Sequence, residues 1–412
     1  MTVCRYAARA LAVMLAVALG GGCTNGAGTA GGEARGSASA PAAPSTPPAS
    51  DTGVPRLAVD EVADGLAHPW DMGFLPDGSV LVTERGGVLK RLTSARPGAS
   101  VERVAATLDD VGARGEGGLM GLVIDPDFAT TRRFLTCQTH LEATRLSDVR
   151  VVSWTLGEDG ASARRVKDLV TGLPVATGGR HSGCRMAIDA SGALLIGTGD
   201  TAVGSIPQDR TSLGGKVLRV SLDTGEGVPD NPFASSANAN ERRVLSYGHR
   251  NIQGIALEAD GGIVTAEHGP SFDDEVNRIR AGANYGWDPS RGGKGTAYDE
   301  SVPMTDAERF PDAVPAIWTS GDMTEAICAV ETLTGPLWTG HEGTLVVTAL
   351  KGAKLLFLRP GADGAIERVD VPSATDGEFD RLRAARLGPD GALYVSTSNG
   401  TNDKILRITP TS

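Results

Sequence analysis

The chain contains 412 residues, of which 40% are hydrophobic, so it can bury a sizeable core. Its 55 glycines and 23 prolines favour many tight turns over long helices. The formal net charge of −11 argues against a nucleic acid partner, because a polyphosphate ligand requires a basic face.

The first 22 residues have the pattern of an export signal. Arg5 and Arg9 precede the apolar stretch Leu11–Leu19, which is too short to remain as a membrane-spanning helix. Cys23 follows three glycines, an arrangement similar to the lipidation site of a bacterial lipoprotein. We therefore expect a lipid on Cys23 and a location on the outer side of the cytoplasmic membrane. The alternative is an ordinary signal peptide and a secreted protein.

Residues 23–54 consist mainly of Gly, Ala, Ser, Thr and Pro, with almost no bulky apolar side chains. Such a segment cannot bury enough surface to offset the entropy cost of ordering it. We interpret residues 23–54 as a disordered linker and residues 55–412 as the folded domain.

A turn rich in Asp, Gly and Pro, followed by an apolar strand, recurs along the folded domain. The clearest copies are LPDGSVLVTERGGVLKRL, from Leu75, and GPDGALYVSTSNGTNDKILRI, from Gly388. The weaker copies begin at Ile124, Ile188, Leu257 and Gly340. The copies are roughly 45 to 85 residues apart, a spacing typical of propeller blades with loop insertions.

These repeats predict an all-β domain closed into a propeller, because closure removes the sheet edges that a row of repeats would expose. A pair of β-sandwiches is the alternative. No long stretch has a 3.6-residue apolar period, so we expect few helices. The longest stretches outside the repeats, at about 141–180, 201–245 and 285–335, are expected to be loops that line a functional face.

Three cysteines lie in the folded domain: Cys137, Cys184 and Cys328. An exported protein can pair two of them, but the sequence does not determine which two. No CxxC spacing is present, so a zinc site is not expected.

Several common catalytic signatures are absent from the sequence, namely the P-loop, the HExxH helix and the GxSxG nucleophile elbow. The glycine cluster between Gly112 and Gly118 is not followed by a helix pattern, which argues against a Rossmann fold. Chemistry through a nicotinamide cofactor is therefore not expected.

Polar side chains gather instead where predicted strands begin. The segment GGRHSGCRMAI contains His181, and YGHRNIQGIAL contains Arg250 and Asn251. A propeller brings such residues from separate blades to one mouth of its central channel. Four cations would form an anion site there, suited to a ligand with several carboxylates: Arg250, Lys351, Arg381 and Arg383.

In this order the segments resemble the soluble pyrroloquinoline quinone (PQQ)-dependent aldose dehydrogenases, also called glucose/sorbosone dehydrogenases. The resemblance covers about residues 58–408, and its most specific pieces are GHRNIQG, EHGP…DEVN…NYGW and LKG. GLAHPWDMGFLPDGSVLVTERGGVLKRL and GEGGLMGLVIDPDF match the first two blades of that family. The resemblance implies a six-bladed β-propeller that oxidises aldose sugars to lactones with PQQ and calcium.

The resemblance also implies roles for individual residues. His181 would be the general base that takes the proton of the anomeric hydroxyl, and Arg250 would stabilise charge on the reduced cofactor. The residues expected to contact the cofactor are Glu116, Arg250, Asn251, Lys351, Arg381 and Arg383. The residues expected to hold calcium are Gly269 and Pro270, through backbone oxygens, and Glu275 and Tyr285 at a second, structural ion.

The chain departs from the family pattern at three positions. Glu116 stands where several members carry a cofactor-contacting Gln, Arg180 where the glucose-oxidising type carries an acid, and Cys184 where Gly is common. An acid at position 116 is unfavourable beside a polyanionic cofactor unless a cation pairs with it. Our hypothesis is that Arg180 provides this pairing.

The expected partners are a small sugar and an external electron acceptor, a quinone or a cytochrome. The departures from the family pattern also motivate a second hypothesis, a non-catalytic propeller that has lost the quinone site and binds other molecules. A third is a calcium-dependent, lactonase-like hydrolase, for which the acidic run from Asp273 to Glu275 supplies the obvious carboxylates.

Overall fold

The computed structural model describes residues 53–411. The predicted signal segment (1–22), the lipidation of Cys23 and all but the last two residues of the predicted linker lie outside the described residues. No helix between residues 53 and 411 is long and apolar enough to cross a membrane.

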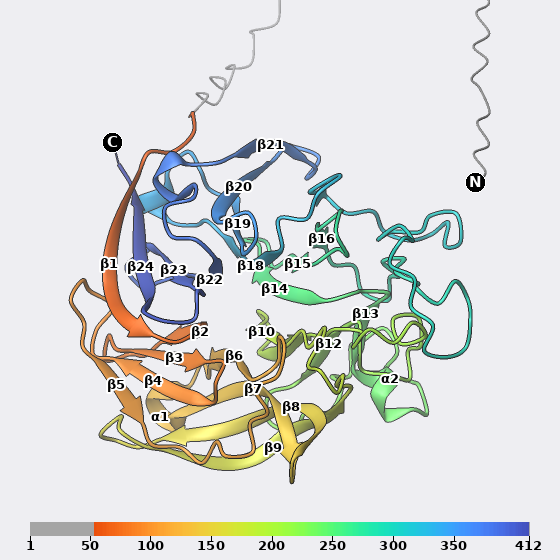
Figure 1. Cartoon of the computed structure of the whole chain (residues 1–412), viewed down its shortest axis with the longest axis horizontal. Helices are drawn as coiled ribbons and strands as arrows, with labels where there is room; N and C mark the ends of the chain where they lie inside the picture. The colour runs from red at the N-terminus through yellow and green to blue at the C-terminus, as the bar shows by residue number, and fades with distance from the viewer. Residues whose placement is uncertain (1–52, 412) are drawn as a thin grey trace, which may run out of the picture. The chain divides into compact units, whose positions relative to one another are not determined.

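The described chain folds into six four-stranded antiparallel sheets, or blades, arranged around a common centre (Figure 1). Blade 1 contains β2 (Pro69–Phe74), β3 (Val80–Glu84), β4 (Val88–Leu92) and β5 (Val101–Val104). Blade 2 contains β6 (Leu119–Ile124), β7 (Arg133–Glu142), β8 (Arg145–Leu156) and β9 (Ala163–Leu173). Blade 3 contains β10 (Arg185–Ile188), β11 (Ala193–Gly197), β12 (Lys216–Ser221) and β13 (Val244–Tyr247).

The remaining three blades follow the same plan. Blade 4 contains β14 (Ile252–Leu257), β15 (Ile263–Glu267), β16 (Glu275–Arg278) and β17 (Trp318–Thr319). Blade 5 contains β18 (Ile327–Thr332), β19 (Leu345–Ala349), β20 (Lys354–Pro360) and β21 (Ile366–Asp370). Blade 6 contains β22 (Leu382–Leu387), β23 (Leu393–Thr397), β24 (Asp403–Pro410) and β1 (Leu57–Leu66).

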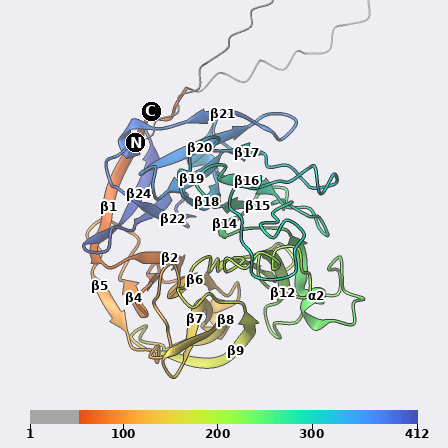
Figure 2. The same ribbon diagram turned by 45° about the vertical axis from the view of Figure 1, so that its right-hand side comes forward.

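The first and last strands of the described chain close the ring. β1 pairs antiparallel with β24, from Leu57 opposite Pro410 to Leu66 opposite Asp403. Both views show the orange-red β1 beside the blue β24 (Figures 1 and 2). Blade 6 is thus built from both ends of the domain, an arrangement that holds the first blade to the last.

The predicted six-bladed all-β propeller is confirmed, and the sandwich alternative is wrong. Helices are few and short in the described residues: α1 (Phe128–Thr131), α2 (Ala239–Arg243) and the 3₁₀ turns η1 (Pro336–Trp338) and η2 (Ser373–Thr375). The prediction of a loop at 141–180 is wrong, because β8 and β9 form a long antiparallel pair there. The turn between these two strands does contain an Asp-Gly pair, Asp159-Gly160, but the predicted repeats did not include it.

The inner strands β2, β6, β10, β14, β18 and β22 surround the central channel (Figure 1). All six end at one mouth of the channel, where Phe74, Ile124, Leu257 and Leu387 line a common cavity. All six therefore begin at the opposite mouth, which we call the site mouth because predicted functional residues such as His181 and Arg250 lie in the loops that enter these strands.

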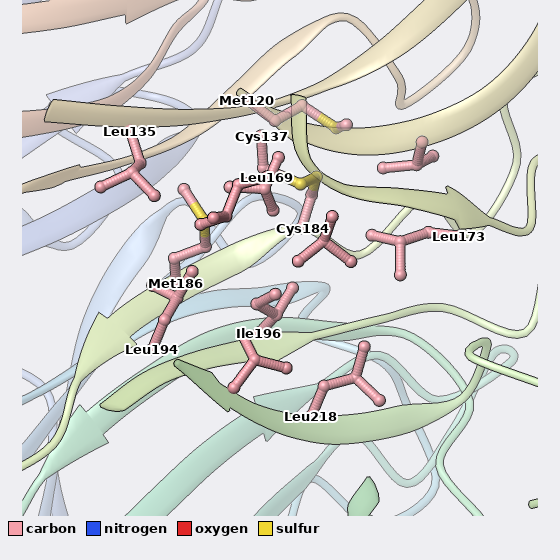
Figure 3. Close-up of a cluster of buried hydrophobic side chains, with 14 of the residues drawn as sticks. Met120, Leu135, Cys137, Leu169, Leu173, Cys184, Met186, Leu194, Ile196 and Leu218 are labelled. Atoms are coloured by element: carbon pink, nitrogen blue, oxygen red, sulfur yellow. A yellow bond between two sulfur atoms is a disulfide. The ribbon is translucent and has the colours of Figure 1, made fainter. Parts of the chain in front are cut away.

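The structure pairs Cys137 with Cys184, a choice that the sequence left open. The disulfide joins β7 of blade 2 to the segment that enters β10 of blade 3. It lies within a buried cluster that includes Met120, Leu135 and Met186 (Figure 3). Cys328 is a buried free thiol.

Candidate functional site

His181 lies in the loop that enters β10, with only 3% of its surface exposed. The loop turns sharply, because His181, Gly183 and Cys184 all have positive φ angles, of 50°, 58° and 84°. A Cβ atom on Gly183 would lie 2.7 Å from the Cα atom of Thr198, so glycine is required for the close approach. The approach brings Nδ1 of His181 to 2.7 Å from Oδ1 of Asp200.

Asp200 is fully buried and both of its oxygens are hydrogen-bonded. The backbone N–H of Ala202 also donates to Oδ1, at 2.8 Å. Trp287 Nε1 and the Tyr298 hydroxyl donate to Oδ2, at 2.8 and 2.7 Å. Because an ionised Asp200 accepts the Nδ1 proton of His181, the tautomer that this contact favours leaves the lone pair on Nε2.

The charge of Asp200 is stabilised by these contacts. Burial alone would raise the pKa of the carboxyl, but the hydrogen bond and charge of His181 outweigh burial, and the net pKa is lowered. Burial and the nearby Asp200 both raise the pKa of Tyr298, so its hydroxyl stays a donor. The sequence did not identify Asp200, Trp287 or Tyr298 as site residues, although the loop at 285–335 was expected to line a functional face.

The other ring nitrogen of His181 faces a pair of charged side chains. Nε of Arg180 donates to Nε2 of His181 at 3.3 Å. Nη2 of Arg180 lies 2.6 Å from Oε1 of Glu300, and the same oxygen lies 2.6 Å from Nη2 of Arg250. The predicted pairing of Arg180 with Glu116 is therefore wrong, because Glu300, 39% exposed and carried by the long loop, takes the guanidinium instead.

Glu116 forms hydrogen bonds that connect the loops entering blades 2, 3 and 4. Oε2 of Glu116 accepts from Nδ2 of Asn251 at 2.8 Å, and Oε1 accepts from the backbone N–H of His181 at 3.2 Å. Burial alone would raise the pKa of Glu116, but the charges of His181 and His268 outweigh burial and lower it. Glu116 thus has buried partners of its own without Arg180.

Arg250 lies at the start of blade 4. Its backbone N–H donates to Glu267, and its Nη1 donates to the carbonyl oxygen of His268 at 3.0 Å. Two buried polar atoms here have no hydrogen-bond partner within residues 53–411: Nε of Arg250 and Nε2 of His268. A water molecule or a ligand at the site mouth would supply the missing contacts.

Cations also gather where blades 1 and 6 approach the site mouth. Arg85, Arg381 and Arg383 form no ion pair with any carboxylate in the described part of the chain. Burial, and then the charge of Arg383, lowers the pKa of both Arg85 and Arg381. Burial and the charge of Arg85 likewise lower the pKa of His68. These groups repel one another, so a bound anion would be stabilising.

The structure thus brings together His181, Arg250, Asn251 and Arg383. Lys351 is exposed in the turn after β19, and its backbone N–H donates to the carbonyl oxygen of Glu325. Its side chain makes no hydrogen bond or ion pair within residues 53–411. Sequence reasoning missed Arg85, because a charged residue in a hairpin turn is usually solvated.

The residues predicted to hold calcium lie after β15, at the start of β16 and after β16. The carbonyl oxygens of Gly269 and Pro270 accept no hydrogen bond from the described residues, so both are free to meet a cation. Burial and Glu267 raise the pKa of the buried Glu275. The Tyr285 hydroxyl donates to the carbonyl oxygen of Arg278, at 2.7 Å.

Side chains alone do not form a metal site in this region. No group of three or more His, Cys, Asp or Glu side chains between residues 53 and 411 is close enough together to hold a metal ion. The predicted calcium sites therefore depend on backbone oxygens, which are normal calcium ligands.

The family model of glucose/sorbosone dehydrogenases matches residues 66–407. The chain therefore belongs to this family, and it is an oxidoreductase of the sugar dehydrogenase class.

One named relative and two solved structures extend the comparison. The chain is 30% identical over 356 residues to aldose sugar dehydrogenase YliI of Escherichia coli K12, covering 85% of this chain and 92% of the relative. The PQQ-bound aldose sugar dehydrogenase of Streptomyces coelicolor is 28% identical, with a TM-score of 0.70, over 87% of this chain and 99% of that one. The apo form of the soluble Escherichia coli enzyme is 29% identical, with a TM-score of 0.73, over 86% and 100% of the two chains.

Proposed function

We propose that this protein oxidises aldose sugars at the anomeric carbon to lactones, with PQQ and calcium as cofactors and His181 as the general base. The observation that carries the proposal is the contact of His181 Nδ1 with Asp200, which leaves Nε2 as a proton acceptor beside a cluster of unpaired cations. A structure of one relative is described as PQQ-bound, and that description supports the choice of cofactor.

The residues present fit a flat, polyanionic cofactor and a hard cation. Arg85, Arg381 and Arg383 would hold carboxylates, since each guanidinium lacks an anionic partner among the described residues. The free carbonyl oxygens of Gly269 and Pro270 would hold calcium. When bound, the quinone accepts hydride and the calcium ion acts as a Lewis acid.

The proton transfer follows from the geometry around His181. Its Nε2 atom would take the proton of the anomeric hydroxyl, while Asp200 holds the ring in position and stabilises the resulting imidazolium. In the structure Nε of Arg180 donates a hydrogen bond to Nε2 of His181, so the guanidinium must move aside before a sugar hydroxyl can donate to the same atom. Arg180 and Glu300 therefore form the wall that a bound sugar meets.

The remaining parts of the function extend beyond this site. We propose that a quinone or cytochrome outside the protein receives the electrons. We also propose export, with a lipid on Cys23 holding the enzyme at the outer side of the cytoplasmic membrane.

The test is to load purified protein with PQQ and calcium and to screen aldoses with an artificial electron acceptor. Turnover is expected, and His181→Gln should lower kcat by about 10³-fold or more without loss of PQQ binding. The matched control is His140→Gln, which alters a second histidine–aspartate contact, with Asp110 at 3.0 Å, and should keep full activity.

Three results would overturn the proposal. Absence of turnover with every sugar, despite bound PQQ, would favour a non-catalytic binding module. Hydrolysis of lactones without PQQ would favour the lactonase-like alternative. Full activity of the His181→Gln variant would remove the histidine from the mechanism.

A further inference from the structure

Asp200 lies near the start of the long loop of blade 3, residues 198–215, which connects β11 to β12. The two residues that follow it, Thr201 and Ala202, both have φ angles of 56°, in the left-handed region that residues other than glycine rarely adopt. This turn directs the backbone N–H of Ala202 to Oδ1 of Asp200, at 2.8 Å. Backbone in such a conformation persists only where its surroundings hold it, so the loop depends on contacts that fix its path.

A buried lysine holds the loop from inside. Lys216, the first residue of β12, has no solvent-accessible surface. Its ammonium group donates to the carbonyl oxygens of Ile206, Pro207 and Gly214, at 2.9, 3.0 and 2.5 Å. Because an ammonium group has three N–H donors, the backbone of this loop satisfies all of them. The loop thus folds around the ammonium group as carbonyl oxygens surround a bound cation.

The loop also connects Lys216 to a second donor of Asp200. The carbonyl oxygen of Pro207 accepts from the backbone N–H of Gly248, and the carbonyl oxygen of Gly248 accepts from the backbone N–H of Trp287, both at 3.0 Å. Nε2 of Gln208 donates to the carbonyl oxygen of Trp287, at 2.9 Å. The indole of Trp287 in turn donates to Oδ2 of Asp200. The loop that Lys216 holds therefore determines the donors at both oxygens of this carboxylate.

This arrangement suits the protonated lysine. A neutral amine has only two N–H groups and would leave one of the three carbonyl oxygens without a donor. Burial lowers the pKa of Lys216 to about 7, and the charges of Asp209 and Asp200 act against this shift. Lys216 is therefore mainly protonated at about pH 6, and its charge then favours the ionised form of Asp200.

We infer that Lys216 is a positioning residue for the His181–Asp200 pair: it holds the loop of blade 3 in the conformation in which Ala202 and Trp287 direct the two oxygens of Asp200. The inference rests on the proposed role of His181 as the base. The ammonium group donates to the backbone of the loop and not to the reacting groups. Its loss should therefore affect the rate of the chemical step more than the binding of the sugar.

Hydrogen exchange at two tryptophan side chains tests this inference in the full-length protein without cofactor. Lys216→Met keeps the length of the side chain and removes the ammonium group. At about pH 6 we expect the indole N–H of Trp287 to exchange at least about tenfold faster in this variant. Trp338, whose indole donates to the carbonyl oxygen of Gly391, is the internal reference and should keep its exchange rate. Equal acceleration at both indoles, or at neither, would refute the inference.

Turnover gives a second readout. In the protein loaded with PQQ and calcium, Lys216→Met should lower kcat at least about tenfold and change KM by less than about twofold. The matched control is Val347→Ala, which removes buried volume from blade 5 and should leave kcat unchanged. A loss of kcat no larger than that of the control would contradict a positioning role.

A further variant keeps the inference testable if Lys216→Met does not fold. Gln208 is only partly buried, and Gln208→Met removes the amide that donates to Trp287. Exchange should then be faster at Trp287 and not at Trp338, and unchanged exchange at Trp287 would overturn the inference. Because exchange requires no substrate, absence of turnover in the wild type would refute the proposed function, while the exchange rates still decide the role of Lys216.

Discussion

The hydrogen bonds of Asp200 predict that two substitutions, Asp200→Asn and Tyr298→Phe, have strongly non-additive effects. Oδ1 accepts from the N–H of Ala202 and from Nδ1 of His181, and Oδ2 accepts from Trp287 Nε1 and the Tyr298 hydroxyl. Each oxygen therefore accepts from one N–H group that can only donate: the backbone N–H of Ala202 at Oδ1 and the indole N–H of Trp287 at Oδ2. Each also contacts one group that can either donate or accept: the imidazole at Oδ1 and the Tyr298 hydroxyl at Oδ2.

In Asp200→Asn the new NH₂ group should take the Oδ2 side, because the Tyr298 hydroxyl can rotate to accept from it. His181 then keeps its proton on Nδ1, and the lost charge and hydrogen bond lower kcat/KM by about 10- to 100-fold. Tyr298→Phe leaves Asp200 ionised with three donors and costs about tenfold at most.

In the double variant no group on the Oδ2 side can accept, so the NH₂ group should turn toward His181. The imidazole then accepts at Nδ1 and carries its proton on Nε2, where it can no longer act as a base. We expect a loss of about 10⁴-fold or more, comparable to the effect of the wrong histidine tautomer in a serine protease triad. This loss exceeds the product of the two single effects.

Two measurements check this prediction: kcat/KM of the reconstituted enzyme, and the ¹⁵N NMR spectrum of the imidazole, which reports the tautomer without cofactor. Tyr394→Phe is the matched control, because its hydroxyl donates to the carbonyl oxygen of Ala95, far from the histidine. Additive losses, or a proton that stays on Nδ1 in the double variant, would refute the reasoning.

Further predictions concern stability and cofactor affinity. Loss of the Cys137–Cys184 disulfide by double substitution with Ser should lower the free energy of unfolding by about 4 kcal/mol, from a sequence separation of 47 residues, and an unchanged urea midpoint would contradict this. Arg381→Gln should weaken PQQ binding about tenfold in an equilibrium titration without lowering the melting temperature, because Arg383 then loses a repulsive neighbour. Glu300→Gln should have the opposite effect and strengthen PQQ binding, and a weaker affinity would show that the carboxylate does not offset the neighbouring cations. The lowered pKa of Asp200 means that the folded state releases this proton more readily than the unfolded state. Its stabilising contribution is therefore present above about pH 4 and lost below it, and acid unfolding curves should show that Asp200→Asn abolishes this component.

The regular part of the fold could be predicted from the sequence because it repeats. The Asp-Gly turn and apolar strand at Leu75 and Gly388 correspond to β3 and β23 and the strands after them. The closing strand β1 lies outside that repeat. Its partner β24 is more than 300 residues away in the chain, so the local sequence does not show that the two strands pair.

The candidate site was predicted only where its residues stand at the start of inner strands. His181 and Arg250 occupy such positions, and closure of the ring brings them together. The partners of these residues come from the loop after β16, where Tyr298 and Glu300 follow no repeat or period. Which carboxylate reaches Arg180 depends on the path of that loop, so the charge argument made from the sequence chose Glu116 where the structure has Glu300.

The most direct test of the account is an equilibrium titration of the calcium-loaded protein with PQQ, followed by its absorbance. We compare the wild type with a variant in which Arg85, Arg381 and Arg383 are all replaced by Gln. The account predicts one PQQ per chain in the wild type and an affinity at least 100-fold weaker in the variant. Absence of binding to the wild type, or equal affinity in both proteins, would contradict it.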